Sequence, residues 1–369
     1  MIYLDSAATS FQKPPQVLRA AEKTLREAAS PGRGAYGAAM KAAELMLEAR
    51  ENAAAFLHFE NPERVVMTMN ATHALNLAIR SLAVPGGRAV ISGFEHNAVT
   101  RPLHGYGLEI DAAGEGLFDS EGLIRSFRKK LPGAALAVYT HVSNVFGYTL
   151  PVREIAALCR DCGVPLIIDA SQSAGVLEID AEALGADFIA MPGHKSLLGL
   201  PGSGLLLCAR EVKPLLFGGS GSDSISQEMP ADLPERLEAG TQNAPAAAAL
   251  SAGISYIMSR GREKIEAHEK ELCAHMAELL RKQDGVELFL PPRGEQSGVL
   301  SLRAQTKDCE QIAAELSGAG ICVRSGLHCA PLAHKSAGTL RTGTVRFSFS
   351  PFNTHAEIEK AAAKFIKII

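Results

Sequence analysis

Short apolar stretches alternate with helix-like stretches through the middle of this 369-residue chain. The apolar stretches lack a strict alternation of apolar and polar residues, which is typical of strands buried on both faces of a sheet. They predict strands at 64–69, 89–92, 135–140, 165–169, 187–191 and 204–208. A helical spacing of apolar residues predicts helices at 72–83, 152–162 and 243–258. Strands separated by helices favour an α/β fold with a mainly parallel sheet.

The pattern changes after about residue 258. A long charged helix at 263–282 is followed by short strands at 286–290, 299–302, 322–324 and 344–349, with helices at 310–317 and 355–368. This mixed order predicts a smaller α+β domain. Because a chain of this length is too long for one core of ordinary size, we expect two domains. We place the large domain at 16–258 and the small C-terminal domain, which the N-terminal segment 1–15 joins, at 259–369.

Composition and charge narrow the class of protein. The chain is 47% hydrophobic and 21% charged, which is ordinary for a soluble enzyme. We expect a cytoplasmic protein, because no signal peptide or membrane-spanning apolar run is visible. The net charge of -3 is too small to indicate a nucleic acid or a membrane as partner. Seven scattered cysteines do not indicate a disulfide framework, and the lone C-x-x-C of Cys159 and Cys162 lacks a second pair at zinc spacing, so no metal site is expected.

Polar clusters follow five of the predicted strands in the large domain. They lie at 70–73, 95–97, 141–144, 169–172 and 192–195. In open parallel sheets, ligands bind beyond the carboxyl ends of the strands. Because random polar residues need not gather on one edge of a sheet, these clusters together predict a binding site there.

Two residues of these clusters indicate the chemistry of the site. Asp169 ends an apolar stretch, where a poorly solvated carboxylate needs a cationic partner such as a protonated pyridine nitrogen. A helix N-cap or a loop salt bridge is the alternative for Asp169. Lys195 lies among apolar residues and glycines, and a buried lysine has a lowered pKa that suits Schiff-base chemistry. Together, Asp169 and Lys195 predict that Lys195 holds pyridoxal 5'-phosphate (PLP).

A phosphate site is expected where a helix begins at Thr72 and His73, directly after a strand. Free backbone amides and the helix dipole favour an anion at such a position. Thr72 serving as the N-cap of the helix is the alternative interpretation, and the two roles are compatible.

Eight blocks of sequence, in order along the chain, carry a family resemblance. They lie at 3–9, 70–76, 94–97, 141–147, 169–172, 193–195, 240–243 and 324–330. The chain resembles the class V aminotransferase family and, within it, a divergent branch of the SufS-like cysteine desulfurases. The resemblance runs from Tyr3 to the C-terminal helix, and the Arg-x-Gly-x-His-Cys loop at 324–329 is characteristic of the desulfurase branch. It implies the fold type I of PLP-dependent transferases, which resembles aspartate aminotransferase and has a seven-stranded, mainly parallel sheet.

The resemblance also implies the residues that bind the cofactor. Lys195 would carry PLP and move protons, Asp169 would pair with the pyridine nitrogen, and Gln172 would donate to the phenolic oxygen. His96 would stack on the ring and is a candidate acid–base group. The implied phosphate contacts are Thr72, His73, His194 and Thr241. Because Thr241 would reach the phosphate of the neighbouring subunit, the resemblance implies a homodimer with shared active sites.

The remaining implied residues act on the substrate. Asn144 and Arg346 would contact the amino acid, with Arg346 binding its carboxylate as a bidentate fork, and we group Arg324 with them. Cys329 matches the nucleophile that receives sulfur, with Arg324 and His328 as the nearest cationic candidates in sequence. A buried structural thiol is the alternative for Cys329. The implied reaction converts L-cysteine to L-alanine, leaves a persulfide on Cys329 and supplies sulfur to iron–sulfur clusters or other pathways, with a sulfur-acceptor protein as a further candidate partner.

Two positions depart from the family pattern, and other functions stay open. Pro192 stands where related desulfurases often have a serine on the phosphate, and Leu327 stands where another histidine is common. A selenocysteine lyase, a cysteine sulfinate desulfinase and an aminotransferase would share the same cofactor site. A non-catalytic binding protein of this fold would be expected to lack Lys195 or Asp169, and both are present.

Overall fold

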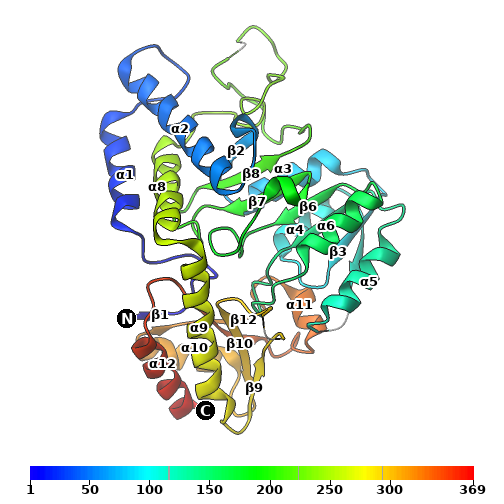
Figure 1. Cartoon of the computed structure of the whole chain (residues 1–369), viewed down its shortest axis with the longest axis vertical. Helices are drawn as coiled ribbons and strands as arrows, with labels where there is room; N and C mark the ends of the chain where they lie inside the picture. Colours follow the sequence, from blue (N-terminus) through cyan, green and yellow to red (C-terminus); the bar gives the residue numbers. More distant parts are fainter. Residues whose placement is uncertain (115–116, 223, 293) are drawn as a thin grey trace.

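A seven-stranded sheet forms the centre of the upper part of the molecule in Figure 1, a computed structural model that describes residues 1–114, 117–222, 224–292 and 294–369. Its strands, in spatial order, are β2 (Val65–Thr68), β8 (Gly204–Cys208), β7 (Phe188–Pro192), β6 (Leu166–Asp169), β5 (Leu136–Thr140), β3 (Arg88–Ser92) and β4 (Glu109–Ala113). Only β8 runs antiparallel to its neighbours, β2 and β7, among these strands. The predicted α/β class with a mainly parallel sheet is therefore confirmed.

The six strands predicted for this sheet are all present, with ends shifted by at most one residue. The prediction missed β4, which pairs only with β3 at the edge of the sheet. Its sequence, Glu-Ile-Asp-Ala-Ala, has two exposed residues at its start and little apolar character. An edge strand needs less burial than a central one, so it leaves a weaker hydrophobic signal.

Helices cover the sheet and position its carboxyl edge. The predicted helices are present as α3 (Ala71–Leu82), α6 (Val152–Asp161) and α8 (Ala244–Arg260), whereas the sequence analysis missed α1 (Pro15–Glu27), α2 (Gly37–Phe56), α4 (Asn97–Gly105), α5 (Ser120–Lys130) and the short α7 (Ala181–Leu184). The alanine-rich α8 packs closely against the segment that follows Lys195, since a Cβ atom on Gly253 would clash with the carbonyl oxygen of Leu197. No helix within the described ranges is both long and apolar enough to cross a membrane.

A four-stranded antiparallel sheet forms the lower part of the molecule in Figure 1. It contains, in order, β12 (Arg324–Gly326), β13 (Thr344–Ser348), β10 (Val299–Ala304) and β9 (Val286–Phe289), and its helices are α9 (Arg262–Arg281), α10 (Cys309–Gly318), α11 (Pro331–Ser336) and α12 (His355–Ile368). The strand predicted at 322–324 is wrong, because Val323 separates β12 from β11 (Ile321–Cys322). The strand β11 pairs with β1 (Ile2–Tyr3) from the N-terminus.

The N-terminal segment therefore lies with the C-terminal part of the chain. Leu4 belongs to an apolar core that otherwise consists of residues between 272 and 368. The domain limits at 16–258 and 259–369 stay a prediction.

Candidate active site

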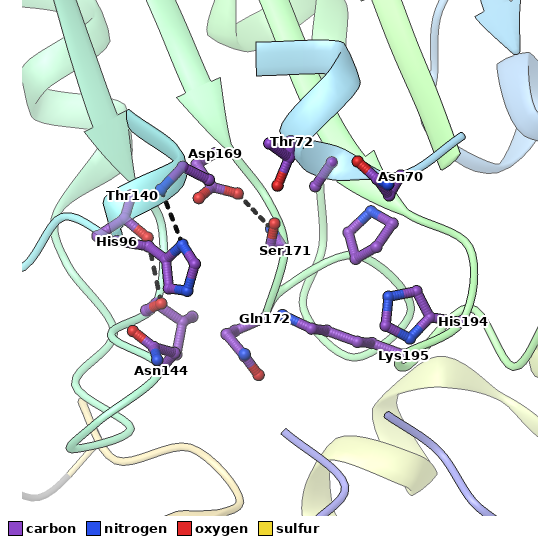
Figure 2. A pocket seen from close by; sticks show the side chains of 14 residues that line it. Asn70, Thr72, His96, Thr140, Asn144, Asp169, Ser171, Gln172, His194 and Lys195 are labelled. Carbon is purple, nitrogen blue, oxygen red and sulfur yellow. Dashed lines mark hydrogen bonds between the residues drawn. The ribbon is translucent and has the colours of Figure 1, made fainter. Parts of the chain in front are cut away.

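One pocket collects residues from all five polar clusters of the sequence. It lies beyond the carboxyl ends of β2, β3, β5, β6 and β7 and is lined by Asn70, Ala71, Thr72, His96, Ala98, Thr140, Val142, Asn144, Asp169, Ser171, Gln172, Pro192, His194 and Lys195. Figure 2 shows Asp169 and His96 on one side, Asn70, Thr72 and His194 on the other, and Lys195 reaching between the two groups. The sheet therefore brings the predicted clusters together.

Lys195 lies in a tight turn directly after β7. Gly193 N donates to the carbonyl oxygen of Ser203 at 2.8 Å, and Gly199 N donates to that of Gly193 at 2.8 Å. These bonds close a loop around the lysine. Loss of hydration is the main reason why the pKa of Lys195 is lowered to about 8; the carboxylate of Asp169 opposes the shift, and Arg346 adds to it. About a tenth of the amine is thus uncharged at pH 7 and able to act as a nucleophile.

Asp169 is the last residue of β6 and is 3% exposed. Its Oδ1 atom accepts a hydrogen bond from Ser171 N at 2.9 Å. Its Oδ2 atom has no hydrogen-bond partner within the described residues, and Asp169 forms no ion pair with a lysine or arginine there. A buried carboxylate with a free oxygen is a suitable partner for a cationic ring nitrogen.

The first turn of α3 forms the opposite end of the pocket. Asn70 is the N-cap and accepts a hydrogen bond from His73 N at 2.9 Å, so the alternative of Thr72 as the N-cap is wrong. The backbone amides of Ala71 and Thr72 have no acceptor within the described chain. Together with the helix dipole, they make this end favourable for a phosphate.

His194 faces this helix from the turn that carries Lys195 (Figure 2). Its Nδ1 atom lies 3.0 Å from Thr9 Oγ1. Loss of hydration, with smaller effects from Lys195 and Lys13, lowers the pKa of His194 to about 4. The ring is therefore neutral at physiological pH and available for hydrogen bonding.

His73 and Thr241 lie outside this pocket and line a neighbouring hollow. His73 Nδ1 accepts a hydrogen bond from Met69 N at 3.3 Å, and its Nε2 atom is buried without a partner in the described structure. The phosphate contacts predicted for these two residues stay predictions, and the one for Thr241 requires a second subunit.

His96 connects the pocket to an outer hollow. It is the N-cap of α4, and its Nδ1 atom accepts a hydrogen bond from Ala98 N at 3.0 Å, so the neutral ring carries its proton on Nε2. Loss of hydration lowers the pKa of His96, and the nearby Asp169 partly opposes this shift. His96 lines both the Lys195 pocket and the hollow that contains Cys329.

Glu95 is a buried residue whose role the sequence analysis missed. Its Oε1 atom accepts hydrogen bonds from Ser92 Oγ at 2.5 Å and from Thr140 N at 2.8 Å. These bonds join the ends of β3 and β5 beneath the pocket. Burial raises the pKa of Glu95 to about 8, so its carboxyl group is mostly neutral at pH 7.

The N-terminal segment 5–13 binds two residues that line the pocket, Gln172 and His194, which the local sequence pattern did not reveal. The carbonyl oxygen of Ala7 accepts a hydrogen bond from Gln172 Nε2 at 3.0 Å. The carbonyl oxygen of His194 accepts from Ser10 N at 3.0 Å and from Lys13 Nζ at 3.2 Å. The block at 3–9 was the only signal for this segment, and it came from the resemblance.

Cys329 is exposed at the end of a strained loop. His328 and Cys329 have φ angles of 48° and 57°, which side chains other than glycine rarely adopt. The backbone is held at two points, because Asn97 N donates to the carbonyl oxygen of Cys329 at 2.7 Å and Asn144 Nδ2 donates to that of His328 at 2.8 Å. The loop thus fixes the thiol beside α4.

Arg324, and not His328, is the cation near this thiol. The Nη2 atom of Arg324 lies 3.8 Å from Cys329 Sγ. The His328 side chain points inward, with Nε2 3.0 Å from Thr344 Oγ1, and burial lowers its pKa well below the ordinary value. A neutral, inward ring cannot stabilise a thiolate, so His328 is wrong as a cationic candidate.

Arg346 is 1% exposed and is already engaged with other protein groups. Its Nη2 atom pairs with Asp5 Oδ1 at 2.6 Å, and Nη1 donates to the carbonyl oxygen of Asn144 at 2.9 Å. Its Nε atom is buried without a partner in the described residues. The bidentate contact predicted for Arg346 stays a prediction, because Asp5 now holds one of the nitrogens.

Comparisons with known proteins show the family and the fold of this chain. The sequence profile described as "Aminotransferase class-V" matches residues 2–361. A relative from Methanothermobacter thermautotrophicus, described as "Probable cysteine desulfurase", is 34% identical over 97% of this chain and 92% of its own length. The structure is similar to the apo structure of a cysteine desulfurase from Thermococcus onnurineus NA1, with 32% identity, a TM-score of 0.92 and coverage of 100% of this chain and 94% of the other.

The fold is shared more widely than the sequence. The Escherichia coli cysteine desulfurase CsdA is 24% identical, and its structure covers 99% of this chain and 94% of its own with a TM-score of 0.87. These likenesses confirm the predicted fold type I of PLP-dependent transferases. The chain belongs to the class-V aminotransferase family.

Proposed function

We propose that this chain is a PLP-dependent cysteine desulfurase that converts L-cysteine to L-alanine and leaves a persulfide on Cys329. The observation that carries the proposal is the position of His96, which lines both the Lys195 pocket and the hollow of the exposed thiol Cys329. A substrate bound at Lys195 would thus be separated from the nucleophilic sulfur of Cys329 by one side chain, that of His96. The names of the relatives support the same reaction.

The residues of the pocket fit PLP. Asp169 offers a free carboxylate oxygen for a protonated ring nitrogen, the unpaired amides of Ala71 and Thr72 suit a phosphate, and Lys195 lies between them. His96 would cover the ring. When bound, the cofactor accepts electrons from the bonds at the substrate Cα atom. Lys195 would then take the Cα proton and return it, which suits an amine whose pKa is lowered to about 8.

The sulfur step balances without a further reactant. The Cys329 thiolate, whose sulfur lies 3.8 Å from Nη2 of Arg324, attacks the substrate sulfur, so that an S–S bond forms while the Cβ–S bond of the substrate breaks. The electron pair of the broken bond ends in a C–H bond of L-alanine after protonation. Cysteine and one enzyme thiol thus yield alanine and one enzyme persulfide.

A homodimer with shared active sites is part of the proposal. The hollow that contains His73 and Thr241 is bordered by exposed apolar side chains, with Met69 54% and Leu216 48% exposed. Apolar side chains gathered around a hollow are typical of a surface that another chain covers. Sedimentation of the loaded enzyme tests this point. A sulfur-acceptor protein would reach the exposed Cys329 from outside.

The function is tested by incubating the loaded enzyme with L-cysteine and a mild reductant, and by measuring alanine and sulfide together. We expect both products in equal amounts. Parallel reactions with L-selenocysteine and L-cysteine sulfinate rank the substrates, because a lyase or a desulfinase would use these and neglect cysteine. Transfer of the amino group to a keto acid, without sulfide, would indicate an aminotransferase instead.

A further inference from the structure

A carboxylate of the protein occupies the site on Arg346 that a substrate carboxylate would use. Asp5 Oδ1 accepts a hydrogen bond from Arg346 Nη2 at 2.6 Å, and no second hydrogen bond joins the two side chains within the described residues. The neighbouring Nε donor of Arg346 is buried without an acceptor in the described residues. Nε and Nη2 form one edge of the guanidinium, which suits two carboxylate oxygens side by side. Asp5 therefore binds one of the two donors on that edge, Nη2, and leaves Nε without a partner among the described residues.

The two partners of this ion pair differ in their freedom to move. The Arg346 side chain is 1% exposed, and its Nη1 atom is also tied to the carbonyl oxygen of Asn144 at 2.9 Å. The Asp5 side chain is 20% exposed. The arginine is therefore fixed, whereas the carboxylate can rotate towards solvent without breaking another side-chain hydrogen bond within the described structure.

The backbone around Asp5 is fixed to the strand that carries Arg346. Ser348 N donates to the carbonyl oxygen of Leu4 at 2.8 Å, and Ala7 N donates to Ser348 Oγ at 2.9 Å. Asp5 thus returns to the same place each time its side chain rotates back. A buried arginine without a carboxylate would be an uncompensated charge, so some partner is needed when no substrate is bound.

We propose that Asp5 is a placeholder for the substrate carboxylate: it pairs with Arg346 in the free enzyme and is displaced when an amino acid binds. This inference rests on the proposed function, in which Arg346 binds the carboxylate of the substrate. Asp5 then acts as a specificity-determining residue. An amino acid replaces the Asp5 carboxylate on Arg346 with its own carboxylate, which also accepts a hydrogen bond from Nε. A simple amine has no carboxylate that could bind Arg346.

The charges around Lys195 agree with such an exchange. Arg346 lowers the pKa of Lys195 and Asp5 raises it, so both lie within electrostatic reach of the amine. When a substrate carboxylate replaces that of Asp5 on Arg346, the guanidinium keeps a carboxylate partner close to Lys195.

Binding of L-alanine to the PLP-loaded enzyme tests the proposal, because alanine binding needs no sulfur chemistry. The visible absorbance of the loaded enzyme follows the titration. We expect Asp5→Asn to lower the Kd of L-alanine by about tenfold, since a competing charge-assisted bond is removed. Asp5→Ser should act in the same direction and serves as the second variant if Asp5→Asn does not fold. The matched control is Ser348→Ala, which loosens the segment but keeps the ion pair, and should not tighten binding.

Two further readouts separate a placeholder from a merely structural residue. The Kd of cysteamine, which lacks a carboxylate, should be the same in Asp5→Asn and in the original enzyme. The melting temperature of Asp5→Asn should fall without ligand and rise more on adding L-alanine than it does in the original enzyme. If both Asp5 variants bind L-alanine equally or more weakly than the original enzyme, Asp5 only orients Arg346 and the proposal is wrong. Failure of the desulfurase proposal would show separately, as absence of alanine from cysteine.

Discussion

The two parts of the candidate active site are built in different ways. Asp169, Lys195 and the start of α3 lie at the carboxyl ends of three strands of one sheet, β6, β7 and β2. Asp5, Cys329 and Arg346 come from three segments, and the ion pair between Asp5 and Arg346 joins residues 341 positions apart. We refer to these as the cofactor side and the substrate side.

The two sides also differ in whether their polar groups are already hydrogen-bonded to other protein groups. On the cofactor side, one oxygen of Asp169 and two amides of α3 are free to receive a ligand. On the substrate side, Arg346 already binds Asp5, and Asn144 already donates to the carbonyl oxygen of His328. The cofactor side is therefore prepared for its ligand, whereas the substrate side must exchange protein partners for substrate groups.

The largest expected effect lies on the cofactor side. Lys195→Ala should abolish covalent attachment of PLP and lower activity by several orders of magnitude, because the nucleophilic amine is lost. Borohydride reduction of the loaded enzyme followed by peptide mapping checks the attachment. Lys13 is the sharpest internal control, since burial also lowers its pKa to about 8 and its Nζ lies 3.2 Å from the carbonyl oxygen of His194. A label on Lys13 would overturn the assignment.

The next effect separates the two sides. Cys329→Ser should retain PLP and bind L-alanine normally, because Cys329 is not among the residues that line the Lys195 pocket. Alanine formation from cysteine should fall by several orders of magnitude, since a hydroxyl is a far weaker nucleophile than a thiolate. Cys162→Ser removes another exposed thiol and should keep full activity. Full activity of Cys329→Ser would contradict the role of Cys329.

A smaller effect tests the substrate side alone. Arg346→Lys keeps the charge but loses the planar fork, so KM for cysteine should rise roughly ten- to hundredfold, which corresponds to a charge-assisted bond of about 1.5–3 kcal/mol. Arg303→Lys is the control, because Arg303 pairs with Glu287 on the same small sheet, away from the pocket. An unchanged KM in Arg346→Lys would mean that another cation binds the carboxylate.

The smallest effect on activity concerns Glu95, which supports the cofactor side. Burial raises the pKa of Glu95 to about 8 from an ordinary value of 4.5, so the folded state holds a proton that the unfolded state releases. Its contribution to stability is thus fully present below pH 4.5 and is lost as the pH rises towards 8. Glu95→Gln should flatten the decline of melting temperature between pH 5 and 8. The same pH dependence in both proteins would show that Glu95 is ionised when folded.

The cofactor side was largely predictable from the sequence, for a physical reason. Buried strands have a strong apolar signal, and a parallel sheet brings polar residues after its strands to one edge. Asp169 and Lys195 could therefore be placed at this edge of the sheet from local sequence. The helix α1 could also have been found, because Pro15 at its first turn is a start signal.

The substrate side could not be derived in this way. The pairing of Asp5 with Arg346 is a contact between distant segments. The sequence around either residue therefore does not indicate its partner. The inward direction of His328 depends on Thr344 of another strand. Sequence spacing offered both Arg324 and His328 as cations beside Cys329, and only the packing of the small sheet excludes His328.

The most direct test of the proposed reaction is a single turnover without reductant. The loaded enzyme is mixed with one equivalent of L-cysteine, alanine is quantified, and the protein is digested for mass spectrometry. We predict one equivalent of alanine and a mass increase of one sulfur atom on the peptide that contains Cys329. Alanine without this modification, or a modification on another cysteine, would contradict the account.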